Sequence, residues 1–594
     1  MSRAGLPDNA PARHEMMLDK DAGIPMRDGA VLRANVFRPA AEGRYPVLMT
    51  LGPYGKDVHI SQFMPDAWEA LKRRHPRILE ASSCKYLAFE TPDPECWVPD
   101  GYVVVKVDSR GAGKSAGTLD VNSPAEFRDF YDAIEWAGVQ PWSNGKVGLL
   151  GISYFGAGQW MIASLRPPHL AAILPWQGAS DFYRDRTRQG GIFCNGFANR
   201  WWNRSVLRDQ HGNPDSPFTD LVTGERNTGP DSFSPEQLRA NRIDYVANIL
   251  AHPLDDAWYR ARSPQFENID IPALVVANWG GLGLHLRGTI EGYLRIASHN
   301  KWLRVQSGSY FLTFLVPESV ALQKRFFDRF LKNIDNGWER EVAVEVAIRG
   351  PGDSVTRSEQ GAQWPLAGIR WTRFHLDAGN MSVSAGAPPQ AAAAADYAAI
   401  GEGVTFSTPP LERELTIAGP LNARLWVSSS TDDMDIFATL RAFDPQGAEL
   451  TFFSATEPRA PVSQGWLRVS QRKLDAERST EYRPYHTHDQ AQKLTPGDVY
   501  PVDVEIWPAS IALPAGYRLA LTLQGKDFER PHAGEAGDAA GEQRGSGWFL
   551  HDDPVDRNAA SFAGTHTVHT GAGRESYLLL PVLAAADATA RPSA

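Results

Sequence analysis

The sequence predicts an α/β domain built on a parallel β-sheet, interrupted by a mostly helical insertion and followed by an all-β domain. Three observations lead to this fold class. Short apolar runs alternate with helical segments up to about residue 175, and this alternation lapses over 180–262. After residue 338, short alternating strands are separated by Gly, Pro and Asp turns. The 594 residues are enough for several domains of roughly 150 residues each.

The parallel sheet is predicted from three apolar runs of strand length in the N-terminal part. These runs are 46–51 (PVLMTL), 102–107 (YVVVKV) and 147–152 (VGLLGI), whereas 31–37 (VLRANVF) alternates as an antiparallel strand does. A crossover helix is expected at 123–137. Its start is indicated by Ser123 as N-cap, Pro124 at the first helical position and Glu126 as the acid of a capping box.

The remainder of the α/β domain is expected after an inserted cap. The insertion at 180–262 is rich in Arg and aromatic residues and includes the helical stretches 197–207 and 235–250. Strands are then predicted at 273–277 and 302–305, and helices at 288–297 and 317–332. We therefore expect residues 1–179 and 263–337 to form the α/β domain and 180–262 to form its helical cap.

The C-terminal residues 338–594 are predicted to form a β-sandwich. Turn sequences such as DPQG at 444–447 recur between short alternating runs. Residues 380–399, with their run of alanines, are expected to be a surface loop or linker. The predicted strands are 342–348, 370–376, 421–427, 435–443, 502–506, 517–523 and 576–582.

The composition argues against several classes of protein. With 60 Lys and Arg against 70 Asp and Glu, the net charge is −10, and no basic face is available for nucleic acid. No apolar run of about 18 residues is present, so no membrane contact is expected. The N-terminus lacks the apolar segment of a secretion signal, and the three cysteines are too scattered for a disulfide framework, which favours the cytoplasm. Neither a metal nor another cofactor is expected, because no histidine pair has a matching set of carboxylate or cysteine partners.

One motif carries catalytic chemistry. The sequence GISYFG at 151–156 follows a predicted buried strand and precedes a helical run. In a nucleophile elbow, a serine occupies the sharp turn from strand to helix, and small residues flank it because the turn leaves little room. Here Gly151 and Gly156 flank Ser153, although the second glycine usually stands one residue earlier. Such a turn would expose the hydroxyl of Ser153 and direct the amide of Tyr154 toward an oxyanion.

The sequence around this motif resembles a known family. The segments concerned are 141–148 (PWSNGKVG), 108–115 (DSRGAGKS), 431–437 (TDDMDIF) and 515–519 (AGYRL). They resemble the cocaine-esterase-like (CocE/NonD) hydrolases, which are relatives of X-prolyl dipeptidyl-peptidases and α-amino-acid ester hydrolases. The resemblance covers most of the chain. It implies an α/β-hydrolase domain, an inserted helical cap and a jelly-roll-like domain that helps to wall the active site.

The resemblance also implies a second site residue. In this family a tyrosine after the first buried strand donates its hydroxyl to the oxyanion, and Tyr54 occupies the matching place in the sequence GPYGK at 52–56. Tyr54, Ser153 and the amide of Tyr154 would then form the core of the site. Without the motif, a turn tyrosine packed on the core would be the favoured interpretation of Tyr54.

The other two members of the triad depart from the family pattern. The family's aspartate would stand at the position of Gly281, and no histidine lies between His299 and His375, where the family's histidine is expected. His285, near the C-terminal end of a sheet strand, is the candidate replacement base or acid. It could instead be a histidine at a helix N-terminus that makes local hydrogen bonds. Three acids, Asp181, Asp255 and Asp256, have the right chain order, but such acids are more often solvated or capping carboxylates.

Two functional hypotheses follow. The first is an ester or amide hydrolase, or an acyltransferase, in which Ser153 attacks the acyl carbonyl of a small molecule. The second is an enzyme of this fold that has lost the Asp and His of the triad and performs a non-hydrolytic step on a biosynthetic intermediate, such as isomerisation, cyclisation or elimination. A small-molecule substrate is expected in both cases, and a homodimer is compatible with the resemblance.

Overall fold

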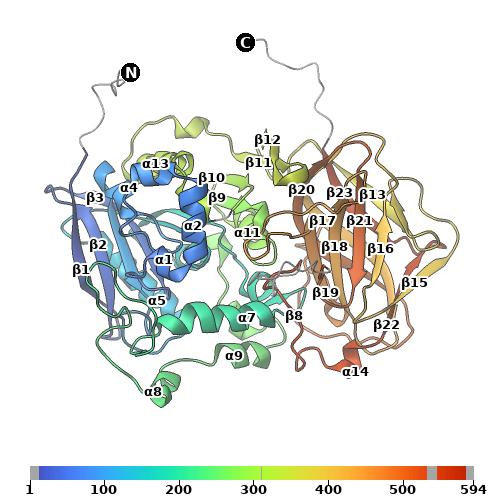
Figure 1. Cartoon of the computed structure of the whole chain (residues 1–594), viewed down its shortest axis with the longest axis horizontal. Coiled ribbons are helices and arrows are strands. Elements are labelled where there is room, and N and C mark those ends of the chain that lie inside the picture. The colour runs from blue at the N-terminus through green and yellow to red at the C-terminus, as the bar shows by residue number, and fades with distance from the viewer. Residues whose placement is uncertain (1–12, 310, 531–544, 584–594) are drawn as a thin grey trace, which may run out of the picture.

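The first domain is built around a ten-stranded mixed sheet (Figure 1). The computed structural model describes residues 13–309, 311–530 and 545–583. In space the strands follow the order β1-β2-β4-β3-β5-β6-β9-β10-β11-β12, and those from β4 to β11 are parallel. Their bounds are β1 (Met16–Pro25), β2 (Val31–Pro39), β3 (Tyr45–Gly52), β4 (Val103–Asp108), β5 (Ser143–Ile152), β6 (Leu170–Trp176), β9 (Ala273–Asn278), β10 (Lys301–Gln306), β11 (Val344–Arg349) and β12 (Val355–Gly361).

Helices cover both faces of this sheet. Apolar residues of α5, α6 and α11 pack on one face, and those of α4 and α13 pack on the other. The N-terminus of α5 forms as predicted, with Ser123 accepting a hydrogen bond from the amide of Glu126 at 3.1 Å. The helices are α1 (Ile60–Phe63), α2 (Pro65–Arg74), α3 (Arg77–Ala81), α4 (Pro94–Trp97), α5 (Pro124–Gly138), α6 (Tyr154–Leu165), α11 (Leu286–Arg295), α12 (Leu312–Leu315) and α13 (Pro317–Leu331).

The segment between β6 and β9 is less helical than predicted, because its short helices are separated by irregular stretches, of which 210–234 is the longest. It begins with a π-helix (Phe182–Thr187) and the two-stranded hairpin β7 (Arg188–Gln189) and β8 (Ile192–Phe193). The helices that follow are α7 (Asn195–Trp201), a π-helix (Trp202–Val206), α8 (Pro235–Ala240), α9 (Tyr245–Ala251) and α10 (Ala257–Arg260). In Figure 1, α7 and β8 lie where the two domains meet.

The first sheet extends past residue 337, where the sequence analysis placed the end of the α/β domain. The predicted strand 342–348 exists as β11, but it pairs with β10 in parallel and β12 pairs with it in turn. An alternating run indicates a strand without indicating which sheet it joins.

The prediction of an all-β C-terminal domain is confirmed, and its main sheet closes on itself. Nine strands in the order β17-β20-β19-β18-β21-β16-β14-β13-β23 form a barrel, because β23 also pairs with β17. The alanine-rich run that was expected to be a loop or linker contains β15, which pairs with β22 outside the barrel. The elements are β13 (Ile369–Asp377), β14 (Ser382–Ser384), β15 (Ala393–Ala398), β16 (Val404–Ser407), β17 (Leu415–Ser429), β18 (Asp435–Phe443), β19 (Ser463–Arg468), β20 (Tyr500–Leu513), β21 (Arg518–Gln524), α14 (Ala559–Phe562), β22 (Thr565–Thr570) and β23 (Tyr577–Leu583).

Loops of the barrel pack against the segment between β6 and β9. The amide of Gly196 in α7 donates to the carbonyl of Leu550 at 3.1 Å, and Arg188 pairs with Asp556 at 2.6 Å. These contacts bring the loop around residue 548 to the C-terminal end of the first sheet. Among the described residues, no helix is long and apolar enough to cross a membrane.

Candidate active site

Ser153 stands at the turn between β5 and α6 with a strained backbone. Its φ of 55° and ψ of −109° lie in a region that residues with a side chain rarely adopt. The turn is held from both sides, because the amide of Ser153 donates to the carbonyl of Trp176 at 3.1 Å and its carbonyl accepts from the amide of Ala157 at 2.7 Å. This strand, turn and helix have the geometry of a nucleophile elbow.

The unusual glycine spacing of the motif has a structural reason. A Cβ on Gly156 would lie 2.9 Å from the carbonyl oxygen of Trp176 and 3.1 Å from the Cα of Gly178, so this position must be small. Phe155 occupies the place where the second glycine usually stands. Its ring fits because Gly52 opposite it has no side chain, and a Cβ there would come within 2.5 Å of the ring.

The four residues predicted for the site line one cavity. Ser153, Tyr54, Tyr154 and His285 all border a space of about 720 Å³ at the C-terminal end of the first sheet. The other lining residues are Phe63, Met64, Phe89, Glu90, Ala157, Ala179, Arg186, Phe197, Trp201, Ser205 and Leu284, together with Ala455, Thr456 and Trp548 from the barrel. The barrel therefore supplies part of the wall, as the family resemblance implied.

Tyr54 is placed so that its phenol can donate a hydrogen bond. The indole Nε1 of Trp201 donates to the Tyr54 hydroxyl oxygen at 2.7 Å, which leaves the phenolic hydrogen for another acceptor. Burial raises the pKa of Tyr54 well above its usual value, and the carboxylate of Glu90 adds to this effect. The phenol is therefore neutral and a donor at neutral pH.

The side chain of Tyr154 is held away from any reacting role. Its hydroxyl donates to the buried carboxyl group of Glu126 at 2.5 Å. Burial raises the pKa of Glu126 to about 7, although hydrogen bonds from Tyr154 and Ser109 oppose that increase. The backbone amide of Tyr154, at the first residue of α6, is thus the part of this residue that is available to the site.

His285 is buried at the start of α11. Its amide donates to the carbonyl of Gly281 at 2.9 Å, and its own carbonyl accepts from the hydroxyl of Thr289 at 2.8 Å. Burial, together with the nearby guanidinium of Arg186, lowers the pKa of His285 to about 3. The imidazole is therefore neutral at physiological pH but weakly basic.

Gly281, where the family resemblance implies an aspartate, is enclosed by other groups. A Cβ on Gly281 would lie 3.1 Å from Oε1 of Gln177 and 3.2 Å from the Cβ of His285. Gln177 is fully buried and comes directly after β6. Tyr310, near the expected place of the family's histidine, lies outside the described residues.

The three other candidate acids are engaged elsewhere. Asp181 and Asp255 both pair with Arg184, at 3.0 and 2.7 Å. Asp256 caps α10 by accepting from the amide of Trp258 at 2.8 Å. None of the three lines the cavity that contains Ser153, among the described residues that border it.

The structure adds Trp201, Glu90 and Arg186 to the polar groups that border the cavity. The sequence analysis places Trp201 only within the helical stretch 197–207 of the aromatic-rich insertion and singles out neither Glu90 nor Arg186. The carbonyl of Glu90 accepts from the amide of Ile152 at 3.0 Å, which fixes Glu90 beside the elbow. No local pattern distinguishes these residues, because they reach the cavity from separate segments of the chain.

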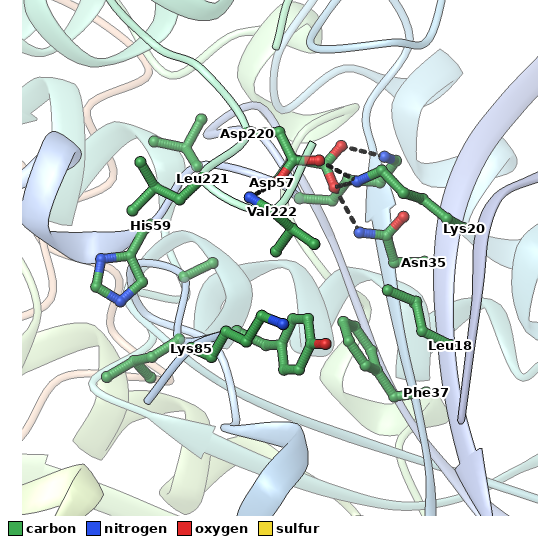
Figure 2. Close-up of a pocket in the computed structure, with 15 residues that line it drawn as sticks. Leu18, Lys20, Asn35, Phe37, Asp57, His59, Lys85, Asp220, Leu221 and Val222 are labelled. Carbon is green, nitrogen blue, oxygen red and sulfur yellow. Dashed lines mark hydrogen bonds and ion pairs between the residues drawn. The ribbon is translucent and has the colours of Figure 1, made fainter. Parts of the chain in front are cut away.

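A second cavity, near the edge of the first sheet, contains a cluster of ion-paired Lys and Asp side chains (Figure 2). Asp57 accepts hydrogen bonds from Lys20 at 2.6 Å and from Asn35 at 2.7 Å. Burial raises the pKa of Asp57, but the ammonium groups of Lys56 and Lys20 outweigh it and bring the value to about 2. This arrangement is that of a structural ion cluster, so the cavity at Ser153 remains the candidate active site.

The fold and the elbow define an α/β hydrolase with a serine at the nucleophile position. Residues 28–310 match the family model of X-Pro dipeptidyl-peptidases (S15 family), and residues 336–579 match the C-terminal non-catalytic domain of X-Pro dipeptidyl-peptidases. A CocE/NonD family hydrolase from Staphylococcus aureus has 32% sequence identity and a TM-score of 0.81, over 96% of this chain and 94% of that chain. The chain belongs to the CocE/NonD family of serine hydrolases.

More distant relatives match over nearly the whole chain. The cocaine esterase of a Rhodococcus species is 23% identical over 94% of this chain and 97% of its own length. An α-amino acid ester hydrolase structure is 17% identical, with a TM-score of 0.63 over 98% of both chains. At this identity the structural likeness concerns the fold alone.

Proposed function

We propose that the protein hydrolyses an ester or amide of a small organic molecule through an acyl-enzyme on Ser153. One observation carries this proposal: Ser153 on its strained turn, the neutral phenol of Tyr54 and the amide of Tyr154 meet at one cavity. A nucleophile and two hydrogen-bond donors at one place are what acyl transfer requires.

The reaction would proceed in two halves. Oγ of Ser153 attacks the acyl carbon and loses its proton to a base, while the carbonyl oxygen becomes an oxyanion that accepts from Tyr54 and the amide of Tyr154. The tetrahedral intermediate collapses when the alcohol or amine leaves with a proton. Water then attacks the acyl-enzyme in the same way and releases the acid. An acyltransferase would differ only in replacing this water by another nucleophile.

His285 is the proposed base. It lines the same cavity as Ser153 and is neutral at physiological pH, as a base must be. Its pKa of about 3 makes proton transfer from serine less favourable than in an ordinary triad, because the efficiency of a base depends on its pKa. We therefore expect slow acylation that requires tight binding of the substrate.

The second candidate function is a non-hydrolytic step in the same cavity, such as isomerisation, cyclisation or elimination. It is supported by the low basicity of His285 and by the expectation that Gly281 stands where the family carries its aspartate. In that case Tyr54 would stabilise an enolate or a similar oxyanion, and no water would be added to the product.

The test is labelling of the protein with a fluorophosphonate, followed by intact-mass measurement, together with turnover of p-nitrophenyl acetate and butyrate. We expect an adduct on the wild-type protein that is lost in Ser153→Ala and greatly slowed in His285→Ala. Ser205→Ala is the matched control, because Ser205 lines the same cavity from the π-helix Trp202–Val206 and not from the elbow, so its removal should leave labelling intact. If the wild type forms no adduct and turns over neither ester, the hydrolase proposal fails and the second candidate is favoured.

A further inference from the structure

Arg186 brings a permanent positive charge to the cavity that contains Ser153. It lies in the π-helix Phe182–Thr187, is 7% exposed and lines the cavity wall. A guanidinium remains protonated in proteins, so this charge cannot be removed by burial.

Other buried arginines of the same segment have carboxylate partners. Arg184 pairs with Asp181 at 3.0 Å, and Arg188 pairs with Asp556 at 2.6 Å. Arg186 forms no ion pair with any residue that the structure describes. A buried charge without a counter-charge is unfavourable, and such charges in proteins are usually paired. Arg186 is therefore the exception that needs an explanation.

The contacts of Arg186 fix its position without neutralising it. Its Nη1 donates to Oδ1 of Asn122 at 3.0 Å, and its Nε has no hydrogen-bond partner among the described residues. The guanidinium stacks over the ring of Trp201 at 4.3 Å and lies 5.4 Å from the ring centre of Tyr154. The phenol of Tyr245 also faces it. These neutral groups orient the guanidinium and leave donors for a ligand.

No other charged or titratable group that lines the cavity, among the described residues, forms an ion pair with Arg186. Glu90 is the one carboxylate among the described residues that line this cavity, and no ion pair of 4.0 Å or less joins it to Arg186. His285 is neutral, and Tyr54 is a neutral donor. The rest of the wall is largely apolar, with Phe63, Phe89, Phe197, Leu284 and Trp548 among its residues.

We propose that Arg186 binds a carboxylate group of the substrate. The substrate class is an ester or amide with an apolar body and a carboxylate separate from the scissile carbonyl. This deepens the proposed function and rests on it for the scissile bond, but the carboxylate site itself does not depend on hydrolysis. The apolar wall would contact the body of the substrate, and Arg186 would bind the carboxylate at one end. The acyl carbon would then lie within reach of Ser153.

The first experiment measures binding without chemistry. Ser153→Ala protein is titrated by calorimetry with 3-phenylpropionate and with the neutral 3-phenylpropanamide. We expect the carboxylate to bind about ten-fold more tightly or better, because it can form a charge-assisted hydrogen bond with the buried guanidinium and the neutral amide cannot. Adding Arg186→Met should abolish this preference, and Arg186→Lys should retain part of it. Equal binding of both ligands to the Ser153→Ala protein would overturn the proposal.

Two controls keep the result specific. Arg208→Met removes another arginine that stacks on an aromatic ring, 4.6 Å from the centre of Phe218, and should leave the preference unchanged. If Arg186→Met does not fold, the Arg186→Lys variant still tests the site. Loss of the preference in Arg208→Met as well would show that the effect is one of overall charge and would refute the assignment.

The second experiment compares ester substrates of matched size. Mono-p-nitrophenyl succinate, glutarate and adipate are compared with p-nitrophenyl butyrate, valerate and hexanoate, which lack the carboxylate. We expect the ratio of kcat/KM for the acidic and neutral esters to fall about ten-fold in Arg186→Met. A carboxylate preference in binding with no ester turnover would uphold the site and reject the hydrolase proposal. Turnover of neutral esters with no preference for the carboxylate in either assay would uphold the hydrolase proposal and reject the carboxylate site.

Discussion

The contact between the barrel and the cap is expected to depend on the charge of His551. This residue is fully buried in the barrel loop that also carries Trp548 into the cavity. Its Nδ1 contacts the carboxylate of Asp527 at 2.8 Å, and its Nε2 contacts Oε1 of Gln189, in β7, at 3.1 Å. The Gln189 amide nitrogen already donates to two carbonyls, so its oxygen must accept from His551. Both ring nitrogens therefore carry a proton, and His551 is an imidazolium.

The size of the effect follows from its pKa. Burial opposes the charge of His551, but the carboxylate of Asp527 is the largest of the groups that outweigh it and raise the pKa from 6.5 to about 10. At about 1.4 kcal/mol for each pKa unit, this amounts to roughly 5 kcal/mol of stability. Because the folded value is the higher one, the stabilisation is fully present below pH 6.5 and is lost as the pH rises through 10.

The perturbation is His551→Asn, which retains a donor for Asp527 but has no charge. We expect the variant to be less stable than the wild type at pH 6, with a difference in unfolding free energy that shrinks steadily toward pH 10. Urea unfolding at several pH values measures this difference, and hydrogen exchange in peptides covering 545–556 shows whether the loss is local. Lys106, whose pKa burial lowers to about 8, titrates in both proteins and cancels in the comparison.

One result would refute the reasoning. If wild type and His551→Asn differ by the same free energy at pH 6 and pH 10, His551 is not charged in the folded protein. The donor assignment at Gln189 would then be wrong. A difference that grows with pH would contradict the sign of the argument, because it would mean that the neutral imidazole is the stabilising form.

Three further predictions concern the candidate active site. Tyr54→Phe removes one oxyanion donor and should lower kcat for ester turnover about 100-fold or more with little change in KM; an unchanged kcat would remove Tyr54 from the mechanism. If His285 is the base, its pKa of about 3 predicts that the rate of Ser153 labelling is flat between pH 5 and 8, and a decrease centred near pH 6.5 would contradict this environment. Gly156→Ala should destabilise the protein by about 1–3 kcal/mol in thermal unfolding, because its Cβ would approach a backbone oxygen at 2.9 Å; an unchanged melting temperature would show that the turn can relax.

Much of the first domain follows from local patterns. The apolar runs at 46–51, 147–152 and 273–277 are strands β3, β5 and β9, because a strand buried on both faces needs such a run. The alanine-rich stretch is a strand that local patterns do not predict. Ala393–Ala398 becomes β15 only by pairing with β22, which lies far along the chain, so its own composition does not predict a strand.

The sequence by itself determined the two kinds of domain, the turn at Ser153 and the resemblance that drew attention to Tyr54. These features depend on periodicity, glycine positions and short motifs, all of which are local. Only the tertiary structure decided that Arg186 and Trp548 border the same cavity as Ser153, and that Trp201 donates to Tyr54. It also decided that burial and Arg186 make His285 a weak base, because desolvation and neighbouring charge come from segments that folding alone brings together.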